Sequence, residues 1–227
     1  MISPRNLLSS FKHRKVGKHV IRREIFRLAD GRRTLDIGCG AGLYRQAFPN
    51  YFGVDVIAGP GVDRVADAHD LPFPDQSFEQ IVTSEVIEHL HTPTKAVQEM
   101  ARVLKPGGRL ILTAPFVYPL HEGPHDYQRF TEYGFALLLQ PYFDNVEIRP
   151  LFNEEQTIAI LLQRVVLQRD TGLIRAMIYT LLAHLFFRLG PSGVSARRQG
   201  LNGQPGHFLT ATYMVTATRR AQGVGAS

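Results

Sequence analysis

The sequence of 227 residues has a single cysteine, Cys39, so no disulfide can form within the chain. One free thiol is typical of a protein from a reducing compartment. The N-terminus lacks the apolar core of a secretory signal. No apolar run reaches the ~20 residues that a membrane-spanning helix needs, since Arg175, His184 and Arg188 interrupt the most apolar stretch. We therefore expect a cytoplasmic protein, and a peripheral contact at the inner membrane surface stays open.

Charged residues make up 20% of the chain and hydrophobic residues 44%, a balance typical of globular proteins. The length suffices for one domain with a sizeable core and an appended element. The net charge of +6 is uneven, because residues 1–33 hold ten Lys and Arg against two acids. Residues 11–29 predict a helix with an apolar stripe and cations over the rest.

This basic helix has two interpretations. It is either the solvated face of a helix packed on the domain, or a surface for the phosphates of nucleic acid or anionic lipid. We favour the first, because no aromatic residues alternate with the cations as single-strand binding requires. Nucleic-acid binding or modification stays an alternative function, and it predicts steeply salt-dependent binding.

The most informative stretch is TLDIGCGAGLY at residues 34–44. A short apolar run ends near Asp36, three glycines follow at every second position, and a short helix is expected before Pro49. Backbone N–H groups lie bare at such a strand-to-helix loop, and glycine permits positive φ or close approach of a ligand. The loop predicts a cradle for a nucleotide-like ligand, with an ordinary strand-to-helix turn as the structural alternative.

The glycine spacing narrows the ligand. Dinucleotide loops read G-x-G-x-x-G, whereas this loop reads G-x-G-x-G and places Leu43 at the third glycine position. Asp36 would also repel a pyrophosphate. A ligand with a positive group fits better, and S-adenosylmethionine carries both a sulfonium and an amino group.

The next strand is expected over 51–56. Asp55 at its end is placed to bind both ribose hydroxyls, although an acid there also starts turns. Gly59-Pro60-Gly61 leaves little room for a crossover helix. Further strands are expected over 63–67, 80–84, 109–113, 143–149 and 207–218, with helices starting at N-cap Thr92 and running from N-cap Thr131 to Leu139.

Four motifs, TLDIGCGAG, FGVDV, VADAHDLPFPDQSFEQIVTSEVIEHL and RVLKPGGRLILT, together resemble the class I S-adenosylmethionine-dependent methyltransferases of the small-molecule type. The resemblance covers about residues 30–152 and the final strand. It implies an α/β, Rossmann-like sheet of seven strands with helices on both faces and strands six and seven antiparallel. It implies that the cofactor meets Asp36, Gly38, Gly40 and Gly42 at its methionine end, Asp55 at the ribose, Asp67 and Ala68 at the adenine, and Ser84 and Glu85 at the sulfonium.

The loop at 114–130 is expected on the acceptor side, because long loops at this edge are usually functional. His125, His121 and His89, in that order, are candidate general bases, and Asp126, Tyr127 and Arg129 are candidate substrate-binding residues. The spacing of His121 and His125 would suit a metal pair on a helix, but Gly123-Pro124 excludes that helix. We therefore expect no metal site.

About fifty residues separate strands six and seven, where helices are expected at 155–168 and 173–189. This helical hairpin either covers the active site, forms a homodimer or contacts a membrane surface. The expected organisation is a basic N-terminal helix at 1–30 and a methyltransferase domain at 31–227, with the insertion at 154–205.

We therefore expect an enzyme that methylates an oxygen, with nitrogen or carbon as alternatives, by in-line transfer from S-adenosylmethionine. The acceptor is expected to be small or linked to a lipid or sugar, because HEGPHDYQRFT resembles a stretch in methyltransferases of polysaccharide or lipid-linked sugar pathways. A homologue that binds the cofactor without turnover is a further alternative.

Overall fold

The computed structural model describes residues 17–168, 172–189, 198–199, 205–206 and 209–221. The chain forms two compact units. The larger consists of Arg22–Phe116, Leu120–Arg149 and Tyr213–Ser227, and the smaller of Met1–Ile21, Val117–Pro119 and Pro150–Thr212.

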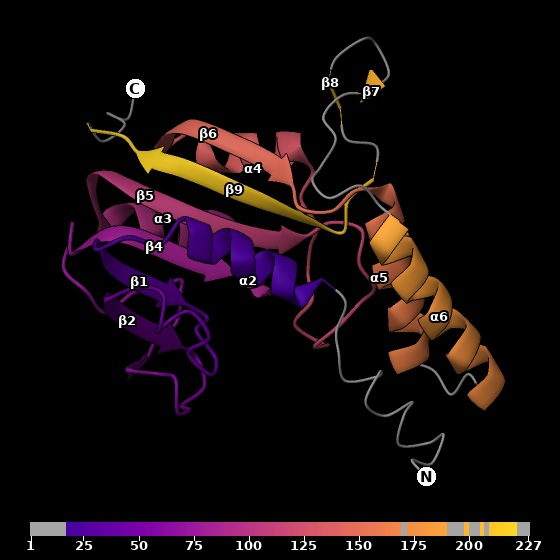
Figure 1. Ribbon diagram of the computed structural model, residues 1–227. Helices are drawn as coiled ribbons and strands as arrows, with labels where there is room; N and C mark the ends of the chain where they lie inside the picture. The colour runs from indigo at the N-terminus through magenta and orange to yellow at the C-terminus, as the bar shows by residue number, and fades with distance from the viewer. Residues whose placement is uncertain (1–16, 169–171, 190–197, 200–204, 207–208, 222–227) are drawn as a thin grey trace. The chain divides into compact units, whose positions relative to one another are not determined.

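The larger unit is built on a seven-stranded sheet with the order β3-β2-β1-β4-β5-β9-β6. β1 pairs in parallel with β2 and β4, and β4 in parallel with β5. β9 runs antiparallel to its neighbours (Figure 1). The expected seven-stranded sheet with one antiparallel strand is therefore confirmed. The strands are β1 (Arg33–Ile37), β2 (Asn50–Asp55), β3 (Arg64–Val65), β4 (Phe78–Ser84), β5 (Leu104–Pro115), β6 (Phe143–Pro150) and β9 (Thr212–Arg219).

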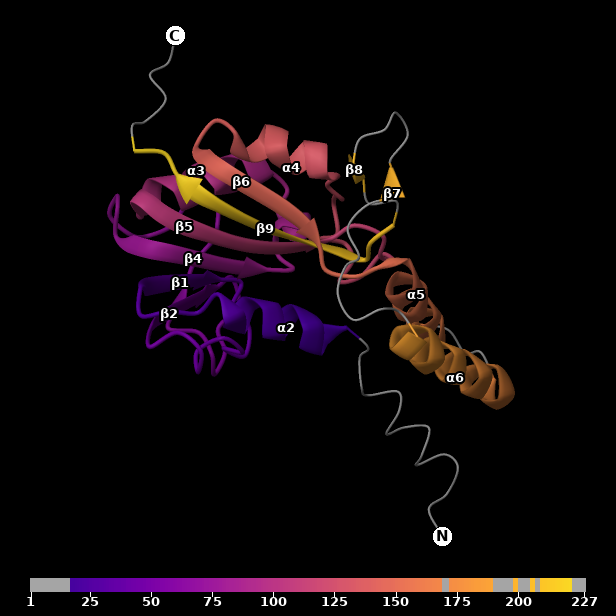
Figure 2. The same cartoon turned by 45° about the horizontal axis from the view of Figure 1, so that its top comes forward.

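Helices lie on both faces of this sheet. α3 (Pro93–Val103) and α4 (Glu132–Leu139) cover one face, and the part of α2 (Lys18–Arg27) that belongs to this unit covers the other (Figures 1 and 2). The apolar positions of α3 recur with helical spacing, so that one side of the helix is buried against the sheet. These buried side chains are Ala96, Val97, Met100, Ala101 and Val103.

The two predicted N-caps differ in the structure. Thr131 caps α4 as expected, since its side chain accepts a hydrogen bond from the N–H of Gly134 at 3.1 Å. Thr92 precedes α3, but its side chain makes no capping hydrogen bond. Its hydroxyl lies 2.7 Å from Nδ1 of His91 instead. The Thr92 side-chain cap is therefore a correction to the expectation.

The predicted helix after the glycine loop is also wrong, because residues 40–47 form successive turns. Gly40 and Gly42 have φ of 51° and 71°, which a right-handed helix cannot include. Few residues remain before Pro49, and so short a helix is marginal. Between β2 and β3 the chain forms turns and bends and no helix, as Gly59-Pro60-Gly61 predicted.

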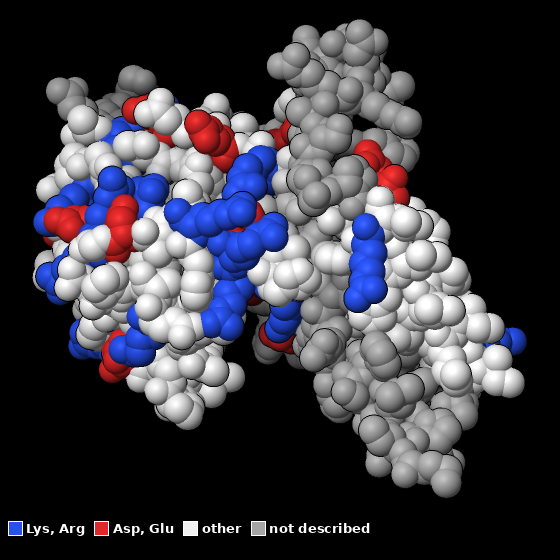
Figure 3. Space-filling view, viewed as in Figure 1, with Lys and Arg blue, Asp and Glu red and all other residues white. Residues whose placement is uncertain are grey.

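α2 carries four basic residues of the N-terminal region, Lys18, Arg22, Arg23 and Arg27. Figure 3 shows Lys and Arg side chains gathered over this helix. Buried Glu24 lies within 3.2 Å of Arg23, 2.8 Å of Arg27 and 3.0 Å of Arg149. Part of the basic face is therefore paired within the unit, which favours the interpretation as a solvated helix face. The basic residues among positions 1–16 lie outside the part of the chain that the structure describes.

The smaller unit contains the predicted helical hairpin. α5 (Glu154–Gln168) and α6 (Leu173–Leu189) pack against each other, and Arg164 lies 4.5 Å above the ring of Tyr118. β7 (Arg198–Gln199) and β8 (Pro205–Gly206) form a short antiparallel pair. None of the helices described in the structure is long and apolar enough to cross a membrane.

In the larger unit, α3 holds the loop at residues 71–75 through Arg102. The guanidinium donates to the carbonyl oxygens of Leu71 and Phe73, each at 2.8 Å, and pairs with Asp75 and Glu99. Glu99 in turn accepts from the N–H of Leu71 at 2.9 Å. The LPFPD segment and the helix before VLKPGG therefore form one hydrogen-bonded unit.

We predict that Arg102→Gln lowers the free energy of unfolding by about 2–4 kcal/mol, because two carbonyls and two carboxylates lose a charged donor. Urea denaturation measures the loss. Lys95→Gln, an exposed cation on the same helix, is the matched control and should stay within about 0.5 kcal/mol of the parent. Equal stability of the two variants would contradict the role given to Arg102.

Candidate active site

The carboxyl ends of the parallel strands meet at one edge of the sheet, where ligands of open α/β folds bind. β1 brings Asp36, β2 brings Asp55, and β4 brings Ser84 and Glu85 to this edge. Most of the predicted cofactor residues thus meet in one place. Their order across the sheet follows the strand order β2-β1-β4.

The glycine loop has the positive φ angles that its sequence predicts. Gly38, Gly40 and Gly42 have φ of 72°, 51° and 71°, values that glycine adopts without steric cost. A Cβ on Gly38 would also lie 2.3 Å from Cγ2 of Val86. Any other residue at this position would displace the turn that follows β4.

Gly61 is a site residue that sequence reasoning missed. A Cβ on it would lie 2.1 Å from the N of Gly42, 2.2 Å from the C of Ala41 and 2.6 Å from the O of Gly40. The turn after β2 therefore packs backbone to backbone against the glycine loop. The only sequence signal was Gly59-Pro60-Gly61, which predicted a break in the chain and no contact with that loop.

Asp55 connects the second strand to the loop. Its carboxylate accepts hydrogen bonds from the N–H of Gly40 at 2.9 Å and the N–H of Ile57 at 3.1 Å. The remaining acceptor sites of its two oxygens can bind hydroxyl groups. Asp67 lies further along this edge, and its carboxylate is engaged with His69, at 2.9 Å from the backbone N and 2.6 Å from Nδ1. Neighbouring Ala68 is buried.

Asp36 is buried at the carboxyl end of β1, with 1% of its surface exposed. Burial raises the pKa of Asp36 to about 7, although a hydrogen bond from the Tyr51 hydroxyl at 2.7 Å opposes the rise, and the charge of Asp55 adds to it. Near neutral pH the carboxyl group therefore exchanges its proton easily. A cation placed beside it would favour the ionised form.

At the carboxyl end of β4, three hydroxyl groups form a hydrogen-bonded chain. Tyr44 donates to Oγ of Ser84 at 2.9 Å, and Ser84 lies 2.9 Å from Oγ1 of Thr113. Glu85 follows with φ of 57°, and its N–H donates to the carbonyl of Thr113 at 2.9 Å. Non-glycine residues with positive φ store strain that often marks a functional site.

The loop after β5 is attached to the turn after β4. The N–H of Tyr127 donates to the carbonyl of Glu88 at 3.0 Å, and the amide of Gln128 donates to the carbonyl of Leu90 at 2.8 Å. Asp126 binds Arg129 at 2.5 and 2.8 Å. Two of the predicted substrate residues, Asp126 and Arg129, thus neutralise each other and shape the loop, while Tyr127 is half-exposed.

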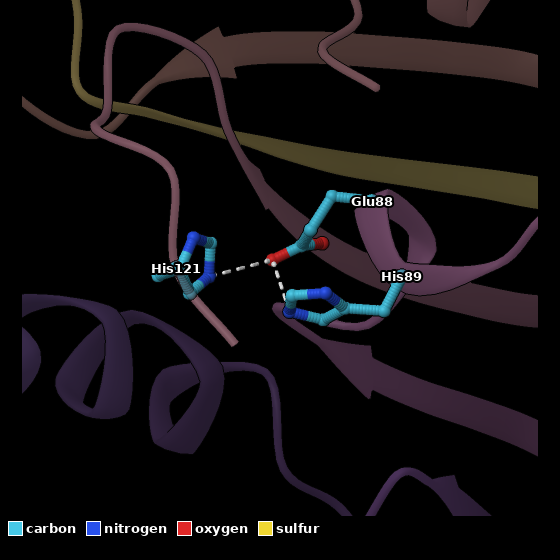
Figure 4. A group of neighbouring side chains, drawn as sticks. All are labelled: Glu88, His89 and His121. Carbon is cyan, nitrogen blue, oxygen red and sulfur yellow. Dashed lines mark ion pairs between the residues drawn. The ribbon is translucent and has the colours of Figure 1, made fainter. Parts of the chain in front are cut away.

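The structure brings the side chains of His89 and His121 together, and the ring of His125 lies outside this group. The first two rings lie 4.9 Å apart, and Nε2 of each approaches Oε1 of Glu88, at 3.6 Å from His89 and 3.8 Å from His121 (Figure 4). The side chain of His125 is exposed, and its Nδ1 lies 3.0 Å from the hydroxyl of Tyr127. His121 therefore pairs with His89, and the pair of His121 and His125 on a helix had already been excluded by Gly123-Pro124.

Glu88 was missed from the sequence. It belongs to the short 3₁₀ turn η1 (Ile87–His89) and is 1% exposed. Burial and the charge of Glu85 raise its pKa far above the usual range. The motif SEVIEHL placed an acid next to His89, but an exposed turn would have looked the same in the sequence.

Comparison with known proteins identifies the family. Residues 35–112 match the family described as "Methyltransferase domain". A demethylmenaquinone methyltransferase of Paenarthrobacter aurescens is 36% identical over 105 residues, 40% of this chain and 41% of that protein. Residues 35–112 therefore form a methyltransferase domain of the class I S-adenosylmethionine-dependent type.

Two further similarities are consistent with this family. A ubiquinone biosynthesis O-methyltransferase of Xanthomonas oryzae is 33% identical over 103 residues, 37% of this chain and 43% of that protein. The Haemonchus contortus phosphoethanolamine N-methyltransferase 2, solved with phosphomonomethylethanolamine and S-adenosylhomocysteine, shares the fold with a TM-score of 0.59 at 16% identity, over 97% of this chain and 58% of that one. The match spans less than half the length of both curated relatives.

We predict that Gly61→Ala weakens binding of S-adenosylmethionine by about 10- to 100-fold, because overpacking of about 1–3 kcal/mol moves the glycine loop. Calorimetric titration measures the change. Gly59→Ala is the matched control, since the nearest atom to its Cβ is Cγ2 of Val62 at 3.9 Å, and it should bind like the parent. Unchanged affinity in Gly61→Ala would contradict the close packing.

Proposed function

We propose that this methyltransferase moves the methyl group of S-adenosylmethionine to an oxygen of a small acceptor. The observation that carries the proposal is the shared edge of the sheet. The glycine loop with Asp36 and Asp55 lies at β1 and β2, and the histidine-rich loop after β5 is hydrogen-bonded to the turn after neighbouring β4.

The cofactor roles follow the charges at this edge. Asp36 faces the positive amino end of the cofactor, and the loop glycines leave the backbone open to its methionine part. Asp55 accepts hydrogen bonds from the ribose, as its free acceptor positions allow. Ser84 and Glu85 lie beside the sulfonium. The adenine lies along the edge toward Asp67 and Ala68.

The acceptor binds on the side of β4 and β5. Methyl transfer is an in-line displacement at a carbon that the sulfonium already activates, so the protein supplies mainly proximity and orientation. The hydroxyl proton goes to a nearby base, for which exposed His125 is placed beside Tyr127. His121 and His89 are the other candidates. Tyr127 contacts the acceptor, and Asp126 with Arg129 hold the loop in shape.

An oxygen acceptor has support from one of the relatives, which is named as a ubiquinone biosynthesis O-methyltransferase. The relatives named for quinones also favour an acceptor with a lipid or apolar part. The sugar-linked acceptors that the HEGPHDYQRFT stretch indicates are a second group to test, with the same chemistry at the reacting oxygen.

Titration of the parent protein with S-adenosylmethionine between pH 5.5 and 7.5 tests the function. The cationic cofactor stabilises ionised Asp36, whose pKa in the free protein is about 7, so binding below that pH releases a proton. We predict that affinity rises with pH by up to about tenfold per unit and levels off above pH 7. Asp36→Asn should weaken binding and remove this rise.

The same shift has a consequence for the unliganded protein. Because the pKa of Asp36 is raised from 3.8 to about 7 on folding, its ionisation opposes the folded state. Stability from this group is therefore greatest below pH 4 and falls as pH rises toward 7.

Failure of well-folded parent protein to bind the cofactor at pH 7.5 would overturn the proposed function.

The hairpin supports a peripheral contact. α6 exposes a row of apolar side chains, flanked near its ends by Arg175 and Arg188. Such a face meets either a lipid surface or a second copy of the chain. The exposed apolar side chains are Ile174, Met177, Ile178, Leu181, Leu185 and Leu189.

We predict that Leu181→Glu with Leu185→Glu abolishes whichever contact exists. Co-sedimentation with anionic vesicles reads out the lipid contact, and light scattering reads out the dimer. Glu154→Lys with Glu155→Lys, at the start of α5, is a charge-changing control that should leave either contact in place. If the parent protein is monomeric and does not sediment with vesicles, both contacts are excluded.

A further inference from the structure

Three side chains converge beside the candidate acceptor site. Glu88 and His89 come from η1 after β4, and His121 comes from the loop after β5 (Figure 4). One ligand atom from each lies within 4.8 Å of the others. The distances of 3.6 and 3.8 Å from Oε1 of Glu88 to the two Nε2 atoms approach the about 3.3 Å that separates ligands of a tetrahedral zinc ion.

Both histidines turn Nε2 toward Glu88, and in His89 the other ring nitrogen, Nδ1, is hydrogen-bonded elsewhere. Nδ1 of His89 lies 2.9 Å from the carbonyl oxygen of His125, so it donates its proton there. Nδ1 of His121 lies 3.2 Å from Oδ2 of Asp126. Metal-binding histidines in proteins are oriented by the same kinds of partner, a carbonyl and a carboxylate. Nε2 of His89 therefore keeps the lone pair that a metal needs, and Nε2 of His121 points toward the same carboxylate oxygen.

Glu88 offers the group a buried oxygen ligand. It is 1% exposed, and neither of its carboxylate oxygens has a hydrogen-bond partner among the residues that the structure describes. An unpartnered buried carboxylate is strongly unfavourable. The guanidinium of Arg129, which acts electrostatically on Glu88, is already paired with Asp126 at 2.5 and 2.8 Å. A metal ion held between the three side chains would bind the Glu88 oxygen directly.

We propose that Glu88, His89 and His121 bind one divalent transition-metal ion. Two imidazoles and a carboxylate suit Zn²⁺, Fe²⁺ or Mn²⁺ and exclude a preference for Mg²⁺ or Ca²⁺, which favour oxygen ligands. Three protein ligands leave positions open, as in catalytic metal sites. Asp126 is a positioning residue for His121, and the carbonyl of His125 for His89.

The role of the ion in transfer rests on the proposed function, whereas its binding does not. An acceptor hydroxyl bound to the ion becomes more acidic. Its proton would pass to His125, the first candidate base of the proposed function, since His89 and His121 would then be metal ligands. The oxygen lone pair then forms the new bond to the methyl carbon as the carbon–sulfur bond breaks, and the sulfur keeps that electron pair and becomes a neutral thioether.

Metal titration of the chelator-treated full-length chain tests the site. We expect one Zn²⁺ per chain by calorimetry, and visible absorption of bound Co²⁺ typical of low coordination number. His121→Asn and Glu88→Gln should each weaken binding at least about 100-fold, beyond the 10–100-fold typical of outer partners. His91→Asn removes an exposed histidine outside the cluster and should bind like the parent.

Thermal unfolding checks that each variant is folded, and His121→Asn decides the outcome if the change at buried Glu88 prevents folding. No stoichiometric binding to the parent, equal binding to His121→Asn, or loss of binding in His91→Asn would each overturn the site. Titration of the same metal-free samples with S-adenosylmethionine separates the two proposals. Cofactor binding without metal binding overturns only the metal site, and metal binding without cofactor binding overturns only the proposed function.

Discussion

Gly38 and Cys39 both donate their backbone N–H to the carbonyl oxygen of Val54, at 2.9 and 3.0 Å, and the rest of the cradle depends on this attachment. It fixes the glycine loop to β2 through main-chain atoms alone. Asp55, one residue further along β2, then reaches the N–H of Gly40. Asp36 on β1 and Asp55 on β2 are consequently held at a fixed distance from each other, which suits the two ends of an extended ligand.

The acceptor side is held by the same kind of contact. The N–H of Glu85 donates to the carbonyl of Thr113, and the N–H of Tyr127 donates to the carbonyl of Glu88. Backbone bonds therefore attach the loops after β4 and β5 to each other, and the Gln128 amide and the Asp126–Arg129 pair add side-chain contacts. The strained backbone of Glu85, with φ of 57°, persists because these hydrogen bonds hold both the turn after β4 and the loop after β5 in place.

The sequence was sufficient where the deciding forces are local. The expected strands, the glycine loop and the N-cap at Thr131 depend on residues near in sequence, and they were predicted. The helix after the glycine loop was wrong because the positive φ values of Gly40 and Gly42 override helix propensity. Gly61 and Glu88 were missed because their roles come from contacts across the sheet. Neither backbone packing on a distant loop nor burial of an acid in a turn has a local pattern.

Asp36 and Glu88 are both buried carboxyl groups near the same edge of the sheet. Each is 1% exposed, and burial raises the pKa of each carboxyl group. Asp36 has a hydroxyl donor in Tyr51, so a singly charged organic cation is enough to favour its ionised form. Glu88 has no donor among the described residues, and the charge of Glu85 acts against it. One ligand atom each from Glu88, His89 and His121 lies within 4.8 Å of the others, and this convergence makes a metal ion the partner that fits there.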